Sequence, residues 1–181
     1  MRARITEIAT LGALASIVVV VVIANQTRSD NADRDGGVEE QSDAAAVLAA
    51  ASYQLLTVDH GFGADAVAPF SQVHVAEQIG DRPGMLLRSL ERELIAAAVN
   101  QAGADVDFET DPNGLIEKLF DAPRPGVAVV VFDELRLETG RAEIDLHLWC
   151  GSLCGIFLTY EIIQEDGGWI ITGPLGPIAM S

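Results

Sequence analysis

The stretch from residue 141 to residue 172, RAEIDLHLWCGSLCGIFLTYEIIQEDGGWIIT, decides the fold of this chain. Apolar and polar side chains alternate on both sides of Gly151, a pattern typical of strands with one buried face. The loop 151–153 joins the two alternating runs, and short loops with Gly are common hairpin connections. Asp166-Gly167-Gly168 is a second turn signal. The segment therefore predicts a β-hairpin followed by a third strand.

Placing Cys150 opposite Cys154 sets the register of the hairpin, and one face then carries both cysteines, aliphatic residues and Tyr160. Opposed Cα atoms lie about 4.5–5.5 Å apart, which a disulfide can span. We therefore predict a Cys150–Cys154 disulfide, as expected for nearby cysteines in an exported domain. Two small buried thiols are the alternative.

The opposite face of the hairpin is mixed in character. Its predicted pairs are Trp149 with Gly155, His147 with Phe157, Asp145 with Thr159, and Glu143 with Glu161. An exposed aromatic patch marks a partner surface, so Trp149, Phe157 and His147 form a candidate interaction surface. Packing of the same rings under a helix is the alternative.

The acidic part of that face is a weak candidate for a metal site. Glu143, Asp145, His147 and Glu161 share it, and alternate strand residues are about 7 Å apart, so a divalent ion could bridge them. A solvated polar surface is the alternative. Glu143 opposite Glu161 is a like-charge pair, which is destabilising unless a cation lies beside it.

Helical and strand patterns alternate before the hairpin. The predicted helices are 44–57, with Asp43 as N-cap, 85–101 and 113–120; the predicted strands are 70–79, 106–108 and 127–132, extended by 135–138. The apolar run 127–132 is typical of a strand buried on both faces. The order predicts an α+β domain with helices on one face of a curved, mostly antiparallel sheet. Cystatin-like and nuclear-transport-factor-like folds are analogues, and analogy transfers no activity.

The N-terminal part of the chain predicts its location. Residues 8–24 carry no charge and would form a helix of roughly 25 Å, close to the ~30 Å of a bilayer core. Residues 1–24 are thus a predicted signal anchor or transmembrane helix, 25–43 an acidic flexible linker, and 44–181 an extracytoplasmic domain. Arg2 and Arg4 place the N-terminus in the cytoplasm. Secretion after cleavage near Ala24 is the alternative.

The charge balance narrows the class of partner. The chain has 27 acidic and 11 basic residues and a net charge of −16. An acidic domain repels phosphate groups, which argues against nucleic-acid binding.

Asp59 and His60 resemble a general-base pair, although both can simply end a helix. The chain contains no GxSxG or HExxH motif and no glycine-rich loop between a strand and a helix, and we expect no cofactor.

Two segments carry a resemblance to a known family. The C-terminal sequence, with LWCGSLCG, then TY, then GGW and a Gly-Pro tail ending in Ser181, resembles small uncharacterised actinobacterial proteins that are membrane-anchored or exported. LLTVDHGFGADAVAPF resembles a second stretch of the same proteins, with Gly61 where that pattern has Thr. The resemblance supports the fold and implies no activity.

These observations predict a membrane-anchored extracytoplasmic protein that acts by binding, as an accessory subunit of a membrane or envelope complex. The alternative is a small exported enzyme or metal- or ligand-binding domain that uses Asp59 and His60 or the Glu143, Asp145 and His147 face.

Overall fold

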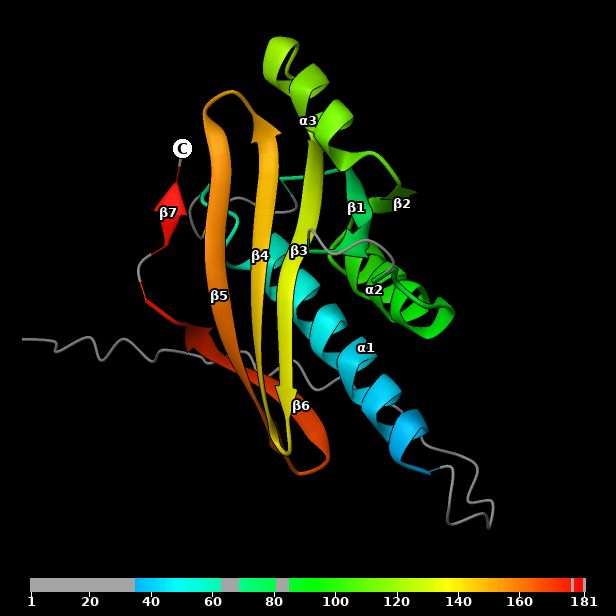
Figure 1. The fold of residues 1–181 in the computed structure, drawn as a ribbon. Coiled ribbons are helices and arrows are strands. Elements are labelled where there is room, and N and C mark those ends of the chain that lie inside the picture. Colours follow the sequence, from blue (N-terminus) through cyan, green and yellow to red (C-terminus); the bar gives the residue numbers. More distant parts are fainter. Residues whose placement is uncertain (1–34, 63–68, 81–84, 177, 181) are drawn as a thin grey trace, which may run out of the picture.

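The computed structural model describes residues 35–62, 69–80, 85–176 and 178–180 (Figure 1). Its three helices are α1 (Asp35–Thr57), α2 (Ser89–Gln101) and α3 (Pro112–Asp121). Its strands are β1 (Gln72–Ile79), β2 (Asp105–Glu109), β3 (Val127–Glu138), β4 (Arg141–Gly151), β5 (Cys154–Glu165), β6 (Gly168–Pro174) and β7 (Ala179–Met180). The predicted α+β class is confirmed.

All strands of the described residues belong to one mixed sheet. The strand order is β2-β1-β3-β4-β5-β6, and β7 pairs with β5 beside the hairpin tip. β3 to β6 form the predicted antiparallel meander. β1 pairs in parallel with both β2 and β3, which the prediction of a mostly antiparallel sheet did not include.

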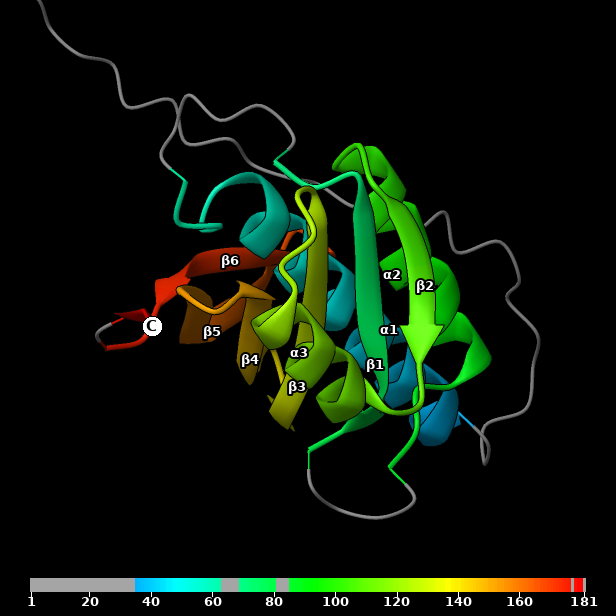
Figure 2. The ribbon, with the colours of Figure 1, turned by 90° about the horizontal axis from the view of Figure 1, so that it is seen from above.

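The helices lie on both faces of the sheet, which corrects the prediction that they share one face. α1 and α2 cover one face, and α3 lies on the other (Figure 2). The chain moves outward from β1 to β2 and then steps back across β1 to β3. Since parallel crossovers are right-handed, two crossovers in opposite directions place α2 and α3 on opposite faces.

The inner face, the one under α1 and α2, holds the main core. Val47, Leu48, Ala51 and Leu55 of α1 are fully buried. They belong to one cluster with inward-facing residues of β3, β4 and β5. The small alanines of α1 let the helix backbone approach the sheet closely. Burial of this stripe is therefore what fixes α1 to the sheet.

α1 begins at Asp35, so the predicted start at Ala44 lies inside the helix. Asp43 is not its N-cap. The Asp43 carboxylate instead accepts a hydrogen bond from the indole Nε1 of Trp169 on β6, at 3.0 Å. The first helix of the domain is thus attached to its last long strand.

A smaller core lies on the outer face, the face opposite α1 and α2. Leu119 of α3 packs on Val127 and Val129, with Trp149 at the margin. The start of α3 is typical of a helix N-terminus. The Asp111 carboxylate accepts a hydrogen bond from the Gly114 backbone N–H at 3.0 Å, and Pro112 occupies the first turn. The strand predicted to be buried on both faces is confirmed, with α1 on one side and α3 on the other.

No helix among residues 35–62 and 85–121 is long and apolar enough to cross a membrane. The predicted anchor, residues 8–24, lies outside the described residues.

Candidate functional site

The predicted register of the β4–β5 hairpin is confirmed from Glu143–Glu161 to Trp149–Gly155, whereas the predicted strand pairing of Cys150 with Cys154 at the tip is wrong. Leu148 pairs with Ile156, and Ile144 pairs with Tyr160, both on the inner face. Glu143 pairs with Glu161 on the outer face. The alternation of side chains thus sorts the hairpin into a buried inner face and an outer face available for function.

The hairpin tip carries the predicted disulfide. Cys150 and Cys154 lie at disulfide distance, with their Cα atoms 5.1 Å apart. The pairing at the tip shifts by one residue, so that Gly151 rather than Cys150 lies opposite Cys154. Gly151 has a φ of 145°, a backbone conformation that residues other than glycine rarely adopt. The tip is therefore held by a cross-link on a tight, bulged turn.

The candidate interaction surface forms a continuous aromatic patch, which we define as His147, Trp149 and Phe157. The Phe157 ring centroid lies 4.7 Å from that of His147 and 4.9 Å from that of Trp149, with an edge-on arrangement to the indole. All three side chains are half-buried. α3 covers the Trp149 end of the patch. The two predicted alternatives, packing under a helix and exposure, therefore each apply to part of the patch.

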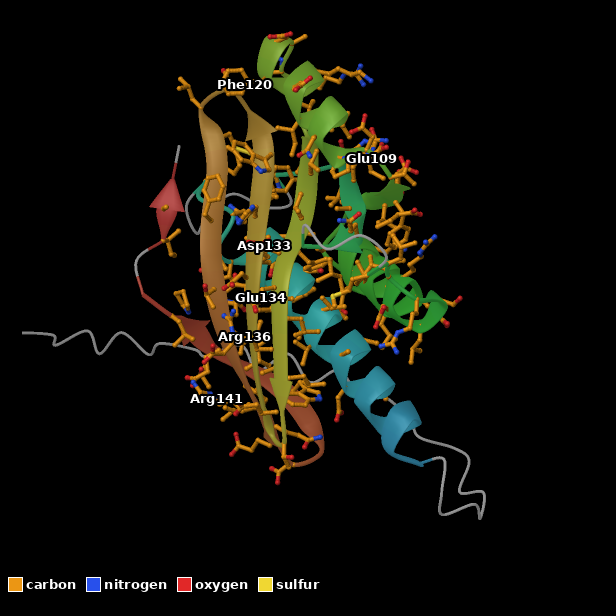
Figure 3. The ribbon with its side chains drawn as sticks, in the orientation of Figure 1. Glu109, Phe120, Asp133, Glu134, Arg136 and Arg141 are labelled. Atoms are coloured by element: carbon orange, nitrogen blue, oxygen red, sulfur yellow. A yellow bond between two sulfur atoms is a disulfide. The ribbon has the colours of Figure 1, made fainter. Side chains whose placement is uncertain are left out.

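Two exposed apolar residues lie at the same end of the molecule as the patch. Leu153 at the hairpin tip is 89% exposed, and Phe120 at the end of α3 is 54% exposed. Figure 3 shows Phe120 beside the hairpin tip. Large apolar side chains on a water-exposed end of a domain are typical of contact surfaces.

The other half of the outer face is a ladder of ion pairs formed by Arg136 and Arg141. Arg136 pairs with Glu143 (Nε–Oε2, 3.1 Å), with both oxygens of Asp145 (3.2 and 3.3 Å) and with Glu134. Hydrogen bonding to Asp145 is the main cause that raises the pKa of Arg136, and Glu143 adds to it. The guanidinium group therefore stays charged and fixes the carboxylates around it.

Arg141 supplies the cation that the Glu143–Glu161 pair requires. Its Nη2 lies 2.8 Å from Glu143 and 2.9 Å from Glu161. Asp145 also accepts a hydrogen bond from Thr159. The carboxylates of the weak metal candidate are thus bound to arginine, and the described residues include no cluster of three or more His, Cys, Asp or Glu side chains that could hold a metal ion.

His147 joins the aromatic patch to the ladder. Burial lowers the pKa of His147, and the nearby carboxylates of Asp133 and Asp145 oppose this effect. The lowered pKa makes the neutral imidazole the dominant form at pH 7. His147 therefore acts there as a polar aromatic ring rather than as a cation.

Asp59 and His60, the catalytic-looking pair, have separate partners. Asp59 accepts hydrogen bonds from the Tyr160 hydroxyl at 2.7 Å and from the Gln54 amide at 3.1 Å. His60 is buried, and its Nδ1 accepts a hydrogen bond from the Phe62 backbone at 3.1 Å. No hydrogen bond joins Asp59 to His60 in the described part of the chain. These contacts hold the C-terminal end of α1 and attach it to β5, as expected if both residues simply end the helix.

Sequence reasoning missed several residues of this surface. Arg141 could have been found, because alternation places it on the same face as Glu143 and Asp145. Asp133 could not, because it lies in a β-bulge between Phe132 and Leu135 that breaks the alternation. Phe120 was hidden in a short helix whose position on the outer face was not predicted.

No family model, curated protein or solved structure matches this chain. The resemblance to small actinobacterial proteins stays a prediction.

Proposed function

We propose that the domain is a membrane-anchored accessory protein that binds a protein partner outside the cytoplasm through the outer face of its sheet. The observation that carries this proposal is the aromatic patch, together with the exposed side chains of Phe120 and Leu153 at the same end of the domain. Aromatic side chains are enriched at protein interfaces, and tryptophan is among the residues that carry most of the binding energy there.

The construction of the patch supports the same conclusion. Two long antiparallel strands hold the three rings in fixed positions, and the disulfide holds the tip that presents Leu153. Rigid presentation lowers the entropy lost on binding. The ladder of ion pairs forms a polar border on one side of the patch, as expected of an interface rim.

The proposed location outside the cytoplasm rests on the uncharged run 8–24 and the basic residues before it. A hairpin closed by a disulfide is consistent with an oxidising compartment.

The test is co-purification of the full-length chain from its native membranes in mild detergent. We expect one protein to co-purify in stoichiometric amount with the wild type and to be lost with Leu153→Asp. Leu86→Asp is the matched control, because Leu86 is 53% exposed but lies outside the patch. Retention of the same protein by Leu153→Asp, or recovery of a lone monomer, would refute the proposal.

A further inference from the structure

The outer face of β4 and β5 has an excess of negative charge beside its aromatic rings. Five carboxylates belong to this surface, from Asp133, Glu134, Glu143, Asp145 and Glu161, and among the described residues only Arg136 and Arg141 pair with them. Figure 3 shows Asp133, Glu134, Arg136 and Arg141 in sequence along the face. Even after the ion pairs form, the surface attracts positive charge.

Asp133 is the carboxylate best placed to receive a cation. It is exposed, and its side chain makes no ion pair or hydrogen bond with another described residue. Its position is fixed by the β-bulge, because the neighbouring Phe132 carbonyl accepts a hydrogen bond from the Gly80 backbone at 2.8 Å. Val131 of β3 pairs with His147, and Asp133 follows two residues later on the same strand, close enough to influence that ring electrostatically.

The aromatic patch beside Asp133 offers ring faces to the same cation. The Phe157 ring meets Trp149 at an interplanar angle of 90° and His147 at 59°, so the rings form an angled surface rather than a flat stack. A guanidinium or ammonium group over a ring face is attracted by the negative charge of that face. A carboxylate next to aromatic rings is therefore a suitable receptor for an arginine or lysine side chain.

From this charge complementarity we infer that the partner contacts the outer face through a basic polypeptide segment, with an arginine or lysine side chain over the aromatic patch and paired with Asp133. Neighbouring apolar side chains of that segment pack on Phe120 and Leu153. This inference rests on the proposed binding function and names the chemistry of its partner.

The same charges disfavour two other occupants. A second copy of the chain would bring one acidic face against another, and each copy carries a net charge of −16. An anionic lipid surface would be repelled for the same reason. A basic protein segment is the occupant that satisfies both the rings and the carboxylates.

The test uses full-length protein in nonionic detergent and three fluorescent decapeptides, in which leucine alternates with arginine, glutamine or glutamate. We expect the arginine peptide to bind most tightly and the glutamate peptide most weakly, as measured by fluorescence polarisation. Asp133→Asn should weaken the arginine peptide about fivefold, the scale of one partly exposed ion pair. Phe157→Leu, which keeps an apolar side chain but removes a ring face, should weaken the arginine peptide and leave the glutamine peptide unchanged.

The control variant is Glu165→Gln, which removes an exposed carboxylate at the end of β5, away from the patch. Equal binding of the arginine and glutamine peptides would overturn the inference. So would equal losses for Asp133→Asn and Glu165→Gln, since these would indicate non-specific attraction to an acidic protein. If a co-purified partner depends on Leu153 but not on Asp133, the binding function stands and the basic segment is wrong.

Discussion

The hydrogen bond between Tyr160 and Asp59 gives the sharpest stability prediction. Tyr160 is fully buried under α1, and its hydroxyl donates to the Asp59 carboxylate at 2.7 Å. Tyr160→Phe removes only the hydroxyl and keeps the ring, so no cavity forms. A hydrogen bond to a charged group contributes about 1.5–3 kcal/mol. Asp59 is partly exposed and keeps its bond to Gln54, so we expect a loss near the lower end, about 1.5 kcal/mol.

A double-mutant cycle in urea measures this contribution directly. Tyr160→Phe and Asp59→Ala, alone and together, should show a coupling free energy of about 1 kcal/mol or more. Tyr53→Phe is the matched control, because the described residues offer its hydroxyl no hydrogen-bond partner, and it should change the free energy of unfolding by less than about 0.5 kcal/mol. The intrinsic fluorescence of Trp169, which is buried, reports unfolding in every variant.

The same pair predicts how stability changes in alkali. Burial, and next the charge of Asp59, raises the pKa of the Tyr160 hydroxyl in the folded domain far above its usual value. The unfolded chain releases that proton near pH 10, whereas the folded domain keeps it. The contribution is therefore fully present below about pH 9 and declines as the pH rises beyond 10. A coupling energy near zero, or the same alkaline decline in Tyr160→Phe as in the wild type, would refute the reasoning.

Three further predictions concern separate features. Gly80→Ala should lower the free energy of unfolding by more than about 2 kcal/mol, because the φ of Gly80 is 65° and an added Cβ would collide with a backbone carbonyl of β3. Gly140→Ala is the control in the same urea titration. Gly140 has a φ of 73° but no atom near the position of an added Cβ, so we expect a cost of only about 1 kcal/mol. Trp169→Phe should cost at least about 1 kcal/mol, because it removes the bond to Asp43 and leaves a cavity at a buried position, as measured by calorimetry against the wild type. Burial lowers the pKa of His147, so on acidification the unfolded chain binds that proton before the folded domain does. Stability should therefore fall as the pH drops below about 6.5. The difference in melting temperature between about pH 7.5 and pH 5.5 should be smaller in His147→Gln than in the wild type.

The β4–β5 hairpin could be predicted almost residue by residue. Alternation fixes which side chains share a face and with it the register, since a shift by one residue would bury Glu143 and expose Leu146. The bulge at the tip, where Gly151 lies opposite Cys154, was not predicted. The same rule predicted the like-charge pair and its need for a cation. Alternation also places the cation on that face, because Arg141 is two residues before Glu143 and contacts both carboxylates. The second cation, Arg136, could not be placed, because it reaches Glu143 from β3, whose register is displaced by the bulge.

The arrangement of helices on both faces could also have been predicted. A strand from Val127 to Phe132 that is buried on both faces needs cover on both. Strands and helices alternate before this strand, in the order β1, α2, β2, α3 and β3. Such alternation favours parallel pairing of the strands. The role of Asp43 could not be predicted in this way, because its partner is Trp169, far along the chain, and local patterns carry no record of it.

The attachment of α1 to β6 has a consequence for the order of folding. Asp43 and Trp169 are 126 positions apart, and α1 also packs on β6 itself. Because a chain is synthesised from its N-terminus, α1 leaves the ribosome well before the strand that completes its contacts. Until Trp169 follows, its apolar stripe lacks part of its final cover. The packing of α1 on α2 needs only nearby sequence, whereas its docking on β6 closes a long loop and should be a late step.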